Sequence, residues 1–521
     1  MFAAGLPGAY GEMRVMRLRP LVLALVLALP ALPGAATAKP KPPAGCTTVV
    51  RGIDLDRATI KDLGVAMYYG RITSVDLVEA YLARIKAYDQ GPGKLNSIRS
   101  LNPDARRQAA ALDKERRRGR ARGWLHGIPI LLKDNVGTSE LPTTAGSIAL
   151  AGSAPKKDAA IVAKLRKAGA IVLGKTNLSE FANWVDLSMP NGYSSLGGQV
   201  VNPYTEGDPS GSSSGSGVAA AMTFAAATIG SETSGSILSP SEANSVVGLK
   251  PTLGAASTAG IIPLAPSFDV PGPMVRSVTD AAVVMDGMTG GSYMNSLDRP
   301  HDLRGVRLGV PSAGNRPSGA RGQLFEAALK KLTALGATLV ETDVVGTAGL
   351  ASITELGAIP NEFKESLNRY LATEARPKTG VKTLSDIVAY NKKHPGKVKY
   401  GQRLLEASDA TPGNAVLATA VATPIRAQAA AVIDAALFQD ELDAIVDVGA
   451  ANANVGAAAG YPSVTVPMGY VNDTVPAGLT FTGHKGFDGK LLGYAYVYER
   501  ASRMRRPPVA LNPDLRPSRC R

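Results

Sequence analysis

The strongest constraint on the fold is the stretch at residues 209–240, in which two short Ser/Gly-rich segments flank an apolar run. The first segment, 209–217, reads Pro-Ser-Gly-Ser-Ser-Ser-Gly-Ser-Gly, and the second, 230–240, reads Gly-Ser-Glu-Thr-Ser-Gly-Ser-Ile-Leu-Ser-Pro. The run between them, 218–229, is rich in Ala and has no Gly or Pro, which predicts a buried helix. A flexible linker would not be interrupted by a buried helix and then resume. We therefore expect two tight loops that face each other and are held by a core helix.

A lysine ends a second apolar run, upstream of these loops. Residues 124–135 read Trp-Leu-His-Gly-Ile-Pro-Ile-Leu-Leu-Lys-Asp-Asn, and 128–132 predict a strand with Lys133 at its end. Burial disfavours the charged form of a lysine. Such a residue either extends its charge to water or stays neutral and acts as a base. Lys175 and Asn177 follow another predicted strand, 170–173, at a strand end where binding residues often lie in α/β sheets. For Lys175 we favour the alternative, a structural ion-pair lysine.

Three segments in chain order carry a family resemblance. They are Gly-Ile-Pro-Ile-Leu-Leu-Lys-Asp-Asn at 127–135, Gly-Ser-Ser-Ser-Gly at 211–215 and Thr-Ser-Gly-Ser-Ile at 233–237. Further matching segments at 164–183, 246–252 and 458–467 extend it over roughly residues 57–505. Together they resemble the amidase signature family, serine hydrolases with a Ser–cis-Ser–Lys triad. The Glu-Thr-x-Gly-Ser-Ile form is closer to the branch with secreted bacterial peptide amidases than to the tRNA-amidotransferase branch.

The resemblance implies that Ser236 is the nucleophile, Lys133 the base and Ser212 the bridging serine on a cis peptide bond. It also implies an oxyanion hole made by the backbone N–H groups of Thr233, Ser234, Gly235 and Ser236. The chemistry agrees, because a serine hydroxyl is a weak nucleophile until a base takes its proton. A neutral buried lysine can be that base through a second hydroxyl. The four His lie in no serine-protease-like arrangement that we recognise, and the family implies no metal or other cofactor.

Substrate contacts are expected near these loops. Three polar residues are the candidates for substrate binding, namely Asp186, Ser188 and Ser213. Residues 345–425 are predicted to be a helical insertion with several Pro that covers the mouth of the site. Three aromatic residues are candidates for the pocket wall, with the core as the alternative for each: Phe363, Tyr370 and Tyr390.

Alternating helix and strand patterns predict the α/β class, with a mixed β-sheet covered by helices on both faces in one large domain at 57–505. A tail at 39–56 precedes this domain, and a tail at 506–521 follows it. Helices are expected at 57–69, 73–88, 158–168 and 323–335. Further strands are expected at 304–310, 338–344, 442–448 and 463–466.

Residues 1–38 have the pattern of a secretory signal peptide. Basic residues precede the apolar run 21–32, and Ala-Thr-Ala at 36–38 supplies a cleavage site near Ala38/Lys39. An uncleaved membrane anchor is the alternative, but Pro30, Pro33 and Gly34 favour cleavage. No second stretch approaches the roughly 18 uncharged apolar residues that a membrane span needs. We therefore expect a secreted or periplasmic protein with no integral membrane span after cleavage.

The two cysteines, Cys46 and Cys520, lie near the two ends of the mature chain. In an exported protein they could form a disulfide, and two unpaired thiols in the tails are the alternative.

The formal charge is +14, and an Arg-rich stretch lies at 116–122. It fits a nucleic-acid patch or the solvated face of a helix. We favour the helix and expect no nucleic-acid partner, because no aromatic residue interleaves.

The predicted function is hydrolysis of a carboxamide C–N bond through an acyl-enzyme on Ser236, with C-terminal peptide amides as one substrate class. An esterase or aryl acylamidase on the same scaffold is an alternative. An amidotransferase A-type subunit is another, against which the signal peptide speaks. From a different class, a non-catalytic binding protein is disfavoured because all three triad positions are intact. The partner expected is a small amide or peptide amide, and the oligomeric state is left open.

Overall fold

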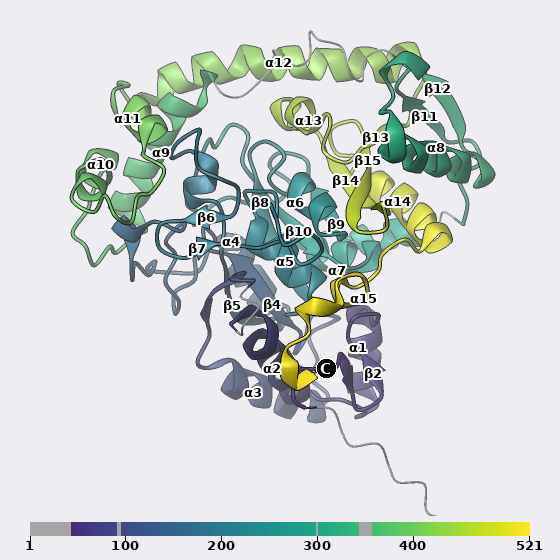
Figure 1. Ribbon diagram of the computed structural model, residues 1–521, viewed down its shortest axis with the longest axis horizontal. Helices are drawn as coiled ribbons and strands as arrows, with labels where there is room; N and C mark the ends of the chain where they lie inside the picture. The colour runs from purple at the N-terminus through teal and green to yellow at the C-terminus, as the bar shows by residue number, and fades with distance from the viewer. Residues whose placement is uncertain (1–42, 91–94, 299–300, 343–356, 521) are drawn as a thin grey trace, which may run out of the picture. The chain divides into compact units, whose positions relative to one another are not determined.

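The computed structural model describes residues 43–90, 95–298, 301–342 and 357–520. The predicted signal peptide lies outside these residues. Within them, eleven strands form one mixed sheet in the order β12-β11-β13-β15-β14-β9-β10-β8-β4-β5-β3 (Figure 1). They are β3 Ile98–Leu101, β4 Pro129–Lys133, β5 Ile171–Thr176, β8 Ala227–Glu232, β9 Val247–Lys250, β10 Val270–Val275, β11 Arg307–Val310, β12 Thr338–Glu341, β13 Ala444–Val448, β14 Ser463–Val471 and β15 Val475–Thr482. Two small hairpins stand apart, β1 Val49–Val50 with β2 Ile53–Asp54, and β6 Tyr193–Ser194 with β7 Gly198–Gln199.

Helices flank this sheet, which confirms the predicted α/β class and its mixed, helix-covered sheet. In the described residues the first eight are α1 Ile60–Tyr68, α2 Ser74–Arg84, α3 Ala105–Arg117, α4 Ala160–Lys167, α5 Ser214–Ala221, α6 Leu238–Ala243, α7 Val278–Thr289 and α8 Gly319–Ala334. The others are α9 Ile359–Thr373, α10 Leu384–Lys392, α11 Arg403–Asp409, α12 Ala415–Gln439, α13 Ala453–Ala459, α14 Asp488–Ser502 and α15 Pro508–Leu511.

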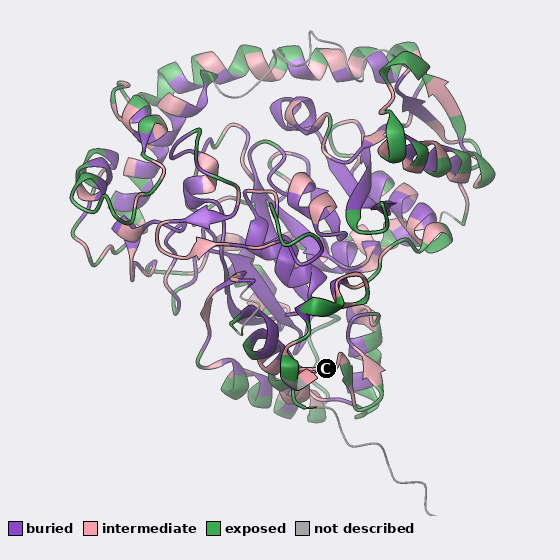
Figure 2. Cartoon of the chain, in the orientation of Figure 1, coloured by how far each residue is buried: buried purple, intermediate pink, exposed green. Residues whose placement is uncertain are grey.

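The centre of the sheet positions the segments that were predicted to be catalytic. Every residue of β4, β5, β8, β9 and β10 is buried, as the purple strands in Figure 2 show. β4 runs parallel to both β5 and β8. The carboxyl ends of parallel strands meet at one edge of a sheet, where α/β proteins commonly bind ligands. Lys133 at the end of β4 and the loop that follows Glu232 in β8 therefore lie at the same edge.

The predicted helix at 218–229 is wrong in its second half. Helix α5 ends at Ala221, Thr223 has a φ of 57°, and the chain then enters β8 at the centre of the sheet. Two buried arginines hold the turn. Arg84 donates to the carbonyl oxygens of Met222 and Thr223 at 2.8 and 3.3 Å. Arg276 donates to that of Ala225 at 2.9 Å. These donors come from distant parts of the chain, so the Ala-rich run alone could not reveal the turn.

The described part of the predicted insertion forms α9, α10, α11 and the first half of α12. Its core is a separate cluster of buried side chains that also includes Phe181 and Trp184. The predicted end at 425 falls inside α12, because that helix continues through Pro424. By length and composition α12 could cross a membrane, which the sequence analysis did not anticipate. Of the residues in its most apolar stretch, 22% are buried, and the helix includes the charged residues Arg426 and Asp434.

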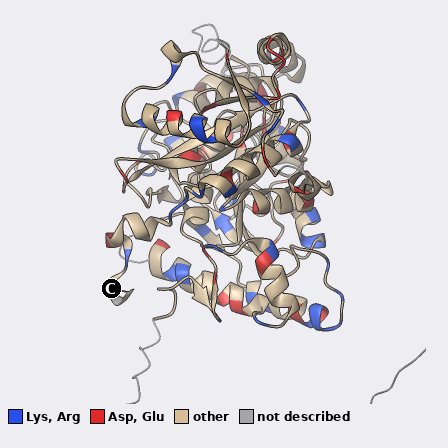
Figure 3. Ribbon diagram, turned by 90° about the vertical axis from the view of Figure 1, so that its right-hand side faces the viewer, with Lys and Arg blue, Asp and Glu red and all other residues tan. Residues whose placement is uncertain are grey.

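The prediction that the Arg-rich stretch at 116–122 is the solvated face of a helix is confirmed only in part, because α3 ends at Arg117 and residues 118–122 lie beyond it. In α3 and the residues after it, Ala109 and Leu112 are buried, whereas Arg106 and Arg117 are exposed. Acidic residues pair with part of this charge, since Arg106 bonds Glu79 at 2.5 Å. Figure 3 shows Lys and Arg spread over many elements, with Asp and Glu among them.

The two ends of the described part of the chain are tied together. Cys46 and Cys520 form a disulfide, the paired form of the two alternatives. Arg505 donates to the Asp56 carboxylate at 2.9 and 3.0 Å, and both residues are nearly buried. The C-terminal segment therefore packs against the N-terminal elements in the described part of the chain, beside α1, β2 and α2 (Figure 1).

Candidate active site

Lys133 is fully buried at the end of β4. Its Nζ lies 2.8 Å from Ser212 Oγ and 3.1 Å from the carbonyl oxygen of Ser231. Burial lowers its pKa to about 7, although the negative charges of Asp269 and Glu232 act in the opposite direction. A lysine with a pKa near neutrality has a large unprotonated fraction at physiological pH, so this amine can act as a base.

Ser212 follows the Gly211–Ser212 peptide bond, which is cis. Its carbonyl oxygen accepts the N–H of Ser179 at 3.1 Å. A Cβ at position 211 would lie 2.7 Å from Ser179 Oγ and 2.8 Å from Asn191 Oδ1. Glycine therefore fits this position because neighbouring side chains occupy the space that a Cβ needs.

The two Ser/Gly-rich loops face each other, and Ser213 joins them. Its backbone N–H donates to the carbonyl oxygen of Ser236 at 3.2 Å. Its Oγ donates to the carbonyl oxygen of Ser231 at 3.0 Å and accepts the N–H of the same residue at 3.2 Å. Ser213 is fully buried. The expectation that Ser213 contacts substrate is therefore replaced by a role in holding the loops, because its hydroxyl is already occupied.

Ser236 lies on the loop between β8 and α6. Within this loop Gly235 has a φ of 71°, a backbone conformation that favours glycine. The buried Glu232 carboxylate accepts the N–H groups of Ile237 and Leu238 at 2.7 and 3.0 Å, which fixes the start of α6 directly after the serine. Glu232 was recognised from the sequence only as part of the Glu-Thr-x-Gly-Ser-Ile form, which did not indicate that it anchors this turn.

Asp269 is a second acidic residue that sequence reasoning missed. Its carboxylate accepts the Thr233 hydroxyl at 2.5 Å and the N–H groups of Leu264 and Ala265 at 2.8 and 3.0 Å. Burial raises the pKa of Asp269, and the hydrogen bonds from Thr233 oppose that shift. Asp269 comes to this edge of the sheet because it precedes β10, which pairs antiparallel to β8 with Val270 opposite Glu232.

A cavity of about 340 Å³ is lined by Ser236, the predicted nucleophile, and we call it the Ser236 cavity. Its polar edge includes Gly211, Thr233, Ser234 and Ser236. Its apolar wall is formed by Trp184, Leu187, Met189, Leu264, Ile359 and Leu404. Two of these, Ile359 and Leu404, come from the described part of the insertion, so the insertion helps to form the wall of the site.

Asp186 also lines the Ser236 cavity, but its charge is already paired. Arg403 donates to it from Nε and Nη2 at 3.0 and 2.8 Å, and these bonds hold the pKa of the carboxyl well below its usual range. Ser188 Oγ donates to Asp186 and can reach the Tyr400 carbonyl oxygen, each at 3.0 Å. The predicted substrate contacts at Asp186 and Ser188 are thus better described as links between the wall and the insertion.

The remaining candidates have different surroundings. Phe363 is fully buried in the core of the insertion, and Tyr390 stacks on His394. Tyr370 lines a second cavity, described below. Lys175 is buried 3.5 Å from Asp134 and also donates to the Val136 carbonyl oxygen at 2.6 Å, which confirms its interpretation as a structural ion-pair lysine.

Comparison with known proteins assigns this geometry to a family. The family model described as Amidase matches residues 76–492. The chain belongs to the amidase signature family. It is 41% identical to the native peptide amidase from Stenotrophomonas maltophilia, with a TM-score of 0.81 over 87% of this chain and 98% of that one. An Arabidopsis thaliana protein described as a probable amidase is 36% identical, over 87% of this chain and 92% of its own length.

A more distant branch also matches. The A-type subunit of the glutamyl-tRNA(Gln) amidotransferase from an Anaeromyxobacter strain is 38% identical over 307 residues, which cover 56% of this chain and 61% of that protein. The match to the peptide amidase spans nearly the full length of that enzyme. This amidase is therefore an enzyme of the hydrolase class that acts on amides, and its family resemblance is confirmed.

Proposed function

We propose that the chain hydrolyses primary carboxamides through a Ser236 acyl-enzyme, with Lys133 and Ser212 as the proton relay. The observation that carries the proposal is the 2.8 Å contact between Lys133 Nζ and Ser212 Oγ at a buried strand end. The loop that carries Ser236 is joined to the loop that carries Ser212 by the hydrogen bond from the Ser213 N–H to the Ser236 carbonyl oxygen. A base, a relaying hydroxyl and a nucleophile are what acyl transfer without histidine requires.

In the proposed reaction, neutral Lys133 takes a proton from Ser212 as Ser212 takes one from Ser236. The Ser236 oxygen attacks the carbonyl carbon, and the N–H groups of residues 233–236 stabilise the oxyanion. The relay then delivers the proton to the leaving nitrogen, the C–N bond breaks, and ammonia departs from the acyl-enzyme. Water repeats the sequence and releases the carboxylic acid.

C-terminal peptide amides are the substrates that we propose. Identity of 41% to a peptide amidase over nearly all of that chain supports this choice. The apolar wall of the Ser236 cavity also supports it, because apolar side chains near a peptide terminus can pack against Trp184, Leu187 and Met189. Aryl acylamides and esters are alternatives, since the same acyl-enzyme chemistry cleaves them.

We also propose that the protein is exported through its first 38 residues. The Cys46–Cys520 disulfide supports this location, because stable disulfides are typical of oxidising compartments. An amidotransferase component would work in the cytosol with partner proteins, so export argues against that role. N-terminal sequencing of protein recovered outside the cytoplasm tests the cleavage near Ala38. Recovery of the uncleaved chain from the cytosol alone would contradict the proposal.

The test of activity is ammonia release from C-terminally amidated peptides, compared with aliphatic and aromatic amides of similar size. Ser236→Ala is the matched control, because it removes one oxygen from a nearly buried site. We expect release from peptide amides that disappears in Ser236→Ala, together with labelling of the wild type by a fluorophosphonate. Activity on anilides alone would change the substrate class, and a Ser236→Ala variant with near-normal rate would refute the mechanism.

A further inference from the structure

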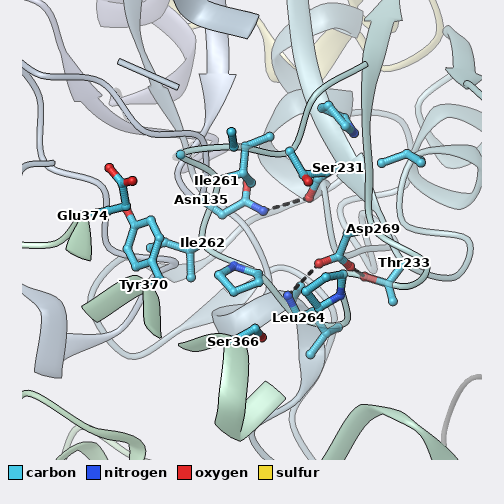
Figure 4. A pocket seen from close by; sticks show the side chains of 18 of the residues that line it. Asn135, Ser231, Thr233, Ile261, Ile262, Leu264, Asp269, Ser366, Tyr370 and Glu374 are labelled. Atoms are coloured by element: carbon cyan, nitrogen blue, oxygen red, sulfur yellow. Dashed lines mark hydrogen bonds between the residues drawn. The ribbon is translucent and has the colours of Figure 1, made fainter. Parts of the chain in front are cut away.

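A second cavity, of about 450 Å³, adjoins the Ser236 cavity across the predicted oxyanion loop. Ala182, Thr233 and Leu264 line both cavities. We call the second one the Asn135 cavity. Figure 4 shows Asn135, Asp269, Tyr370 and Glu374 around it, with Asp269 hydrogen-bonded to Thr233.

The Asn135 cavity is much larger than ammonia needs. Ammonia is close in size to water, which occupies roughly 30 Å³ in the liquid. The cavity volume exceeds this value more than tenfold. A carbonyl carbon bound to Ser236 carries two substituents, the acyl chain and the leaving nitrogen. Two adjoining cavities therefore offer room for a substituent on each side of the reacting carbon.

The polar atoms of the Asn135 cavity are suited to N–H donors. Asn135 Nδ2 donates to Ser231 Oγ at 2.9 Å, whereas its Oδ1 is buried and has no hydrogen-bond partner among the described residues. The same holds for the buried Tyr370 Oη on α9. Asn135 is 5% exposed and Tyr370 is 6% exposed. A buried polar group without a partner is costly, so a ligand that fills both sites is favoured.

The charges of the cavity favour a cation. Asp269 and Glu374 both line it. Among the described residues Glu374 forms an ion pair with Lys157, at 4.0 Å, and 75% of the Lys157 side chain is exposed. Arg369 also lines the cavity, but its guanidinium bonds Glu365 at 2.6 Å on the exposed surface. The wall therefore carries two carboxylates and two unpartnered acceptors among apolar side chains, and its one cation in the described part of the chain, Arg369, is already paired.

We propose that the Asn135 cavity binds the amine half of the substrate, so that the enzyme also cleaves N-substituted amides whose amine carries a second, cationic amino group. This inference rests on the proposed acyl-enzyme function. The Ser236 oxygen forms a bond to the carbonyl carbon, the C–N bond breaks, and the serine proton leaves on the amine nitrogen. Water then forms the acid and restores the serine.

The test uses one blocked amino acid as the acyl group in three substrates: its primary amide, its pentylamine amide and its putrescine amide. The two amines have the same length and differ in a terminal methyl or ammonium group. We expect both substituted amides to be cleaved, with kcat/KM about tenfold higher for the putrescine amide, the size of one charge-assisted hydrogen bond.

Three variants test whether the Asn135 cavity causes the preference for the putrescine amide. Tyr370→Phe removes only the unpartnered hydroxyl, and Glu374→Gln removes a charge from a side chain that is 24% exposed. For each of these two variants we expect the ratio of kcat/KM for the putrescine amide to kcat/KM for the pentylamine amide to fall toward one, because KM for the putrescine amide rises. Tyr390→Phe is the matched control, because Tyr390 packs on His394 outside the cavity, and it is expected to keep the wild-type ratio.

The outcomes separate the two proposals. Cleavage of the primary amide with refusal of both substituted amides would overturn the inference and leave the proposed function standing. Equal rates for the two substituted amides would show that the acceptors do not recognise an ammonium group, which also overturns it. If none of the three amides reacts and a fluorophosphonate does not label Ser236, the proposed function fails and the inference fails with it.

Discussion

At the scale of single residues, the proposed base Lys133 is expected to set how the enzyme responds to pH. Its pKa of about 7 results from burial, and the base must be unprotonated to act. We expect kcat/KM for an uncharged amide to rise about tenfold per pH unit below that value and to level off above it. The measurement is a pH–rate profile from about pH 5 to about pH 9, a range that spans the titration.

An uncharged substrate keeps this profile free of substrate titration. Lys133→Ala should reduce turnover by at least about 10²–10⁴, the usual contribution of a general base. Lys133 would be ruled out as the titrating base by a pH–rate profile that is flat across the range. A Lys133→Ala variant whose kcat/KM rises with pH as in the wild type would rule it out as well.

Asp269 is predicted to influence the same titration from a neighbouring position. It lines the Asn135 cavity, bonds Thr233 at 2.5 Å and raises the pKa of Lys133 through its charge. Glu232 acts on Lys133 in the same direction, and Glu362 faces Asp269 from α9. Removing the charge in Asp269→Asn should therefore move the acid limb of kcat/KM to lower pH.

Thr233→Val provides the comparison, because it removes the hydrogen bond to Asp269 and keeps the charge. We expect this variant to lower kcat by about tenfold, less than the 10²–10³ lost with a whole oxyanion donor, and to leave the limb where it is. If both variants shift the limb equally, or neither does, then Asp269 has no electrostatic effect on the base.

The sequence predicted part of this site and could not predict the rest. Lys133 was recognisable because a lysine at the end of an apolar strand is unusual, and Ser236 because the family motif surrounds it. Asp269 lies 33 residues after Ser236, and no local pattern connects it to Thr233. Contacts of this kind arise from strand pairing between β8 and β10, which a single sequence does not specify.

At the scale of elements, the first turn of α5 is packed too tightly for any side chain at position 215. A Cβ there would lie 2.4 Å from the Asn177 carbonyl oxygen and 2.5 Å from that of Ser97. Backbone atoms cannot move aside as a side chain can, so Gly215→Ala should destabilise the fold by about 1–3 kcal/mol or more. The displaced loop should also lower kcat, because Ser212 lies three residues away.

Gly396→Ala is the matched control, since its Cβ would meet no atom within 4 Å. Thermal unfolding and kcat, measured on both variants, test the idea. A Gly215→Ala protein that melts and reacts like the wild type would show that the loop can open to admit a methyl group.

The helices and strands show where prediction from the sequence succeeds and where it fails. Periodicity identified the helix pair α1 and α2 and the strands β4 and β5, because their patterns are local. The run at 218–229 was assigned wrongly, because Arg84 and Arg276 satisfy the carbonyl groups of a turn inside it. Tertiary contacts overrode the helix propensity of alanine at this position.

At the scale of the whole chain, the Cys46–Cys520 bridge joins segments 474 residues apart. A cross-link over so long a loop removes much conformational freedom from the unfolded state. The two Ser/Gly-rich loops of the proposed active site are held by their own hydrogen bonds, such as that from the Ser213 N–H to the Ser236 carbonyl oxygen. The bridge should therefore contribute to stability more than to turnover.

We expect the Cys46→Ser/Cys520→Ser double variant to lose about 2–5 kcal/mol of unfolding free energy and to keep its kcat at moderate temperature. The ion pair between Asp56 and Arg505 is independent of the bridge and should keep the C-terminal segment in place. Denaturant unfolding with and without reductant measures the effect. Reductant should lower the stability of the wild type to that of the double variant and leave the variant unchanged, because only the wild type has a bond to reduce. A wild type that does not respond to reductant under unfolding conditions would mean that the two cysteines are not joined in solution.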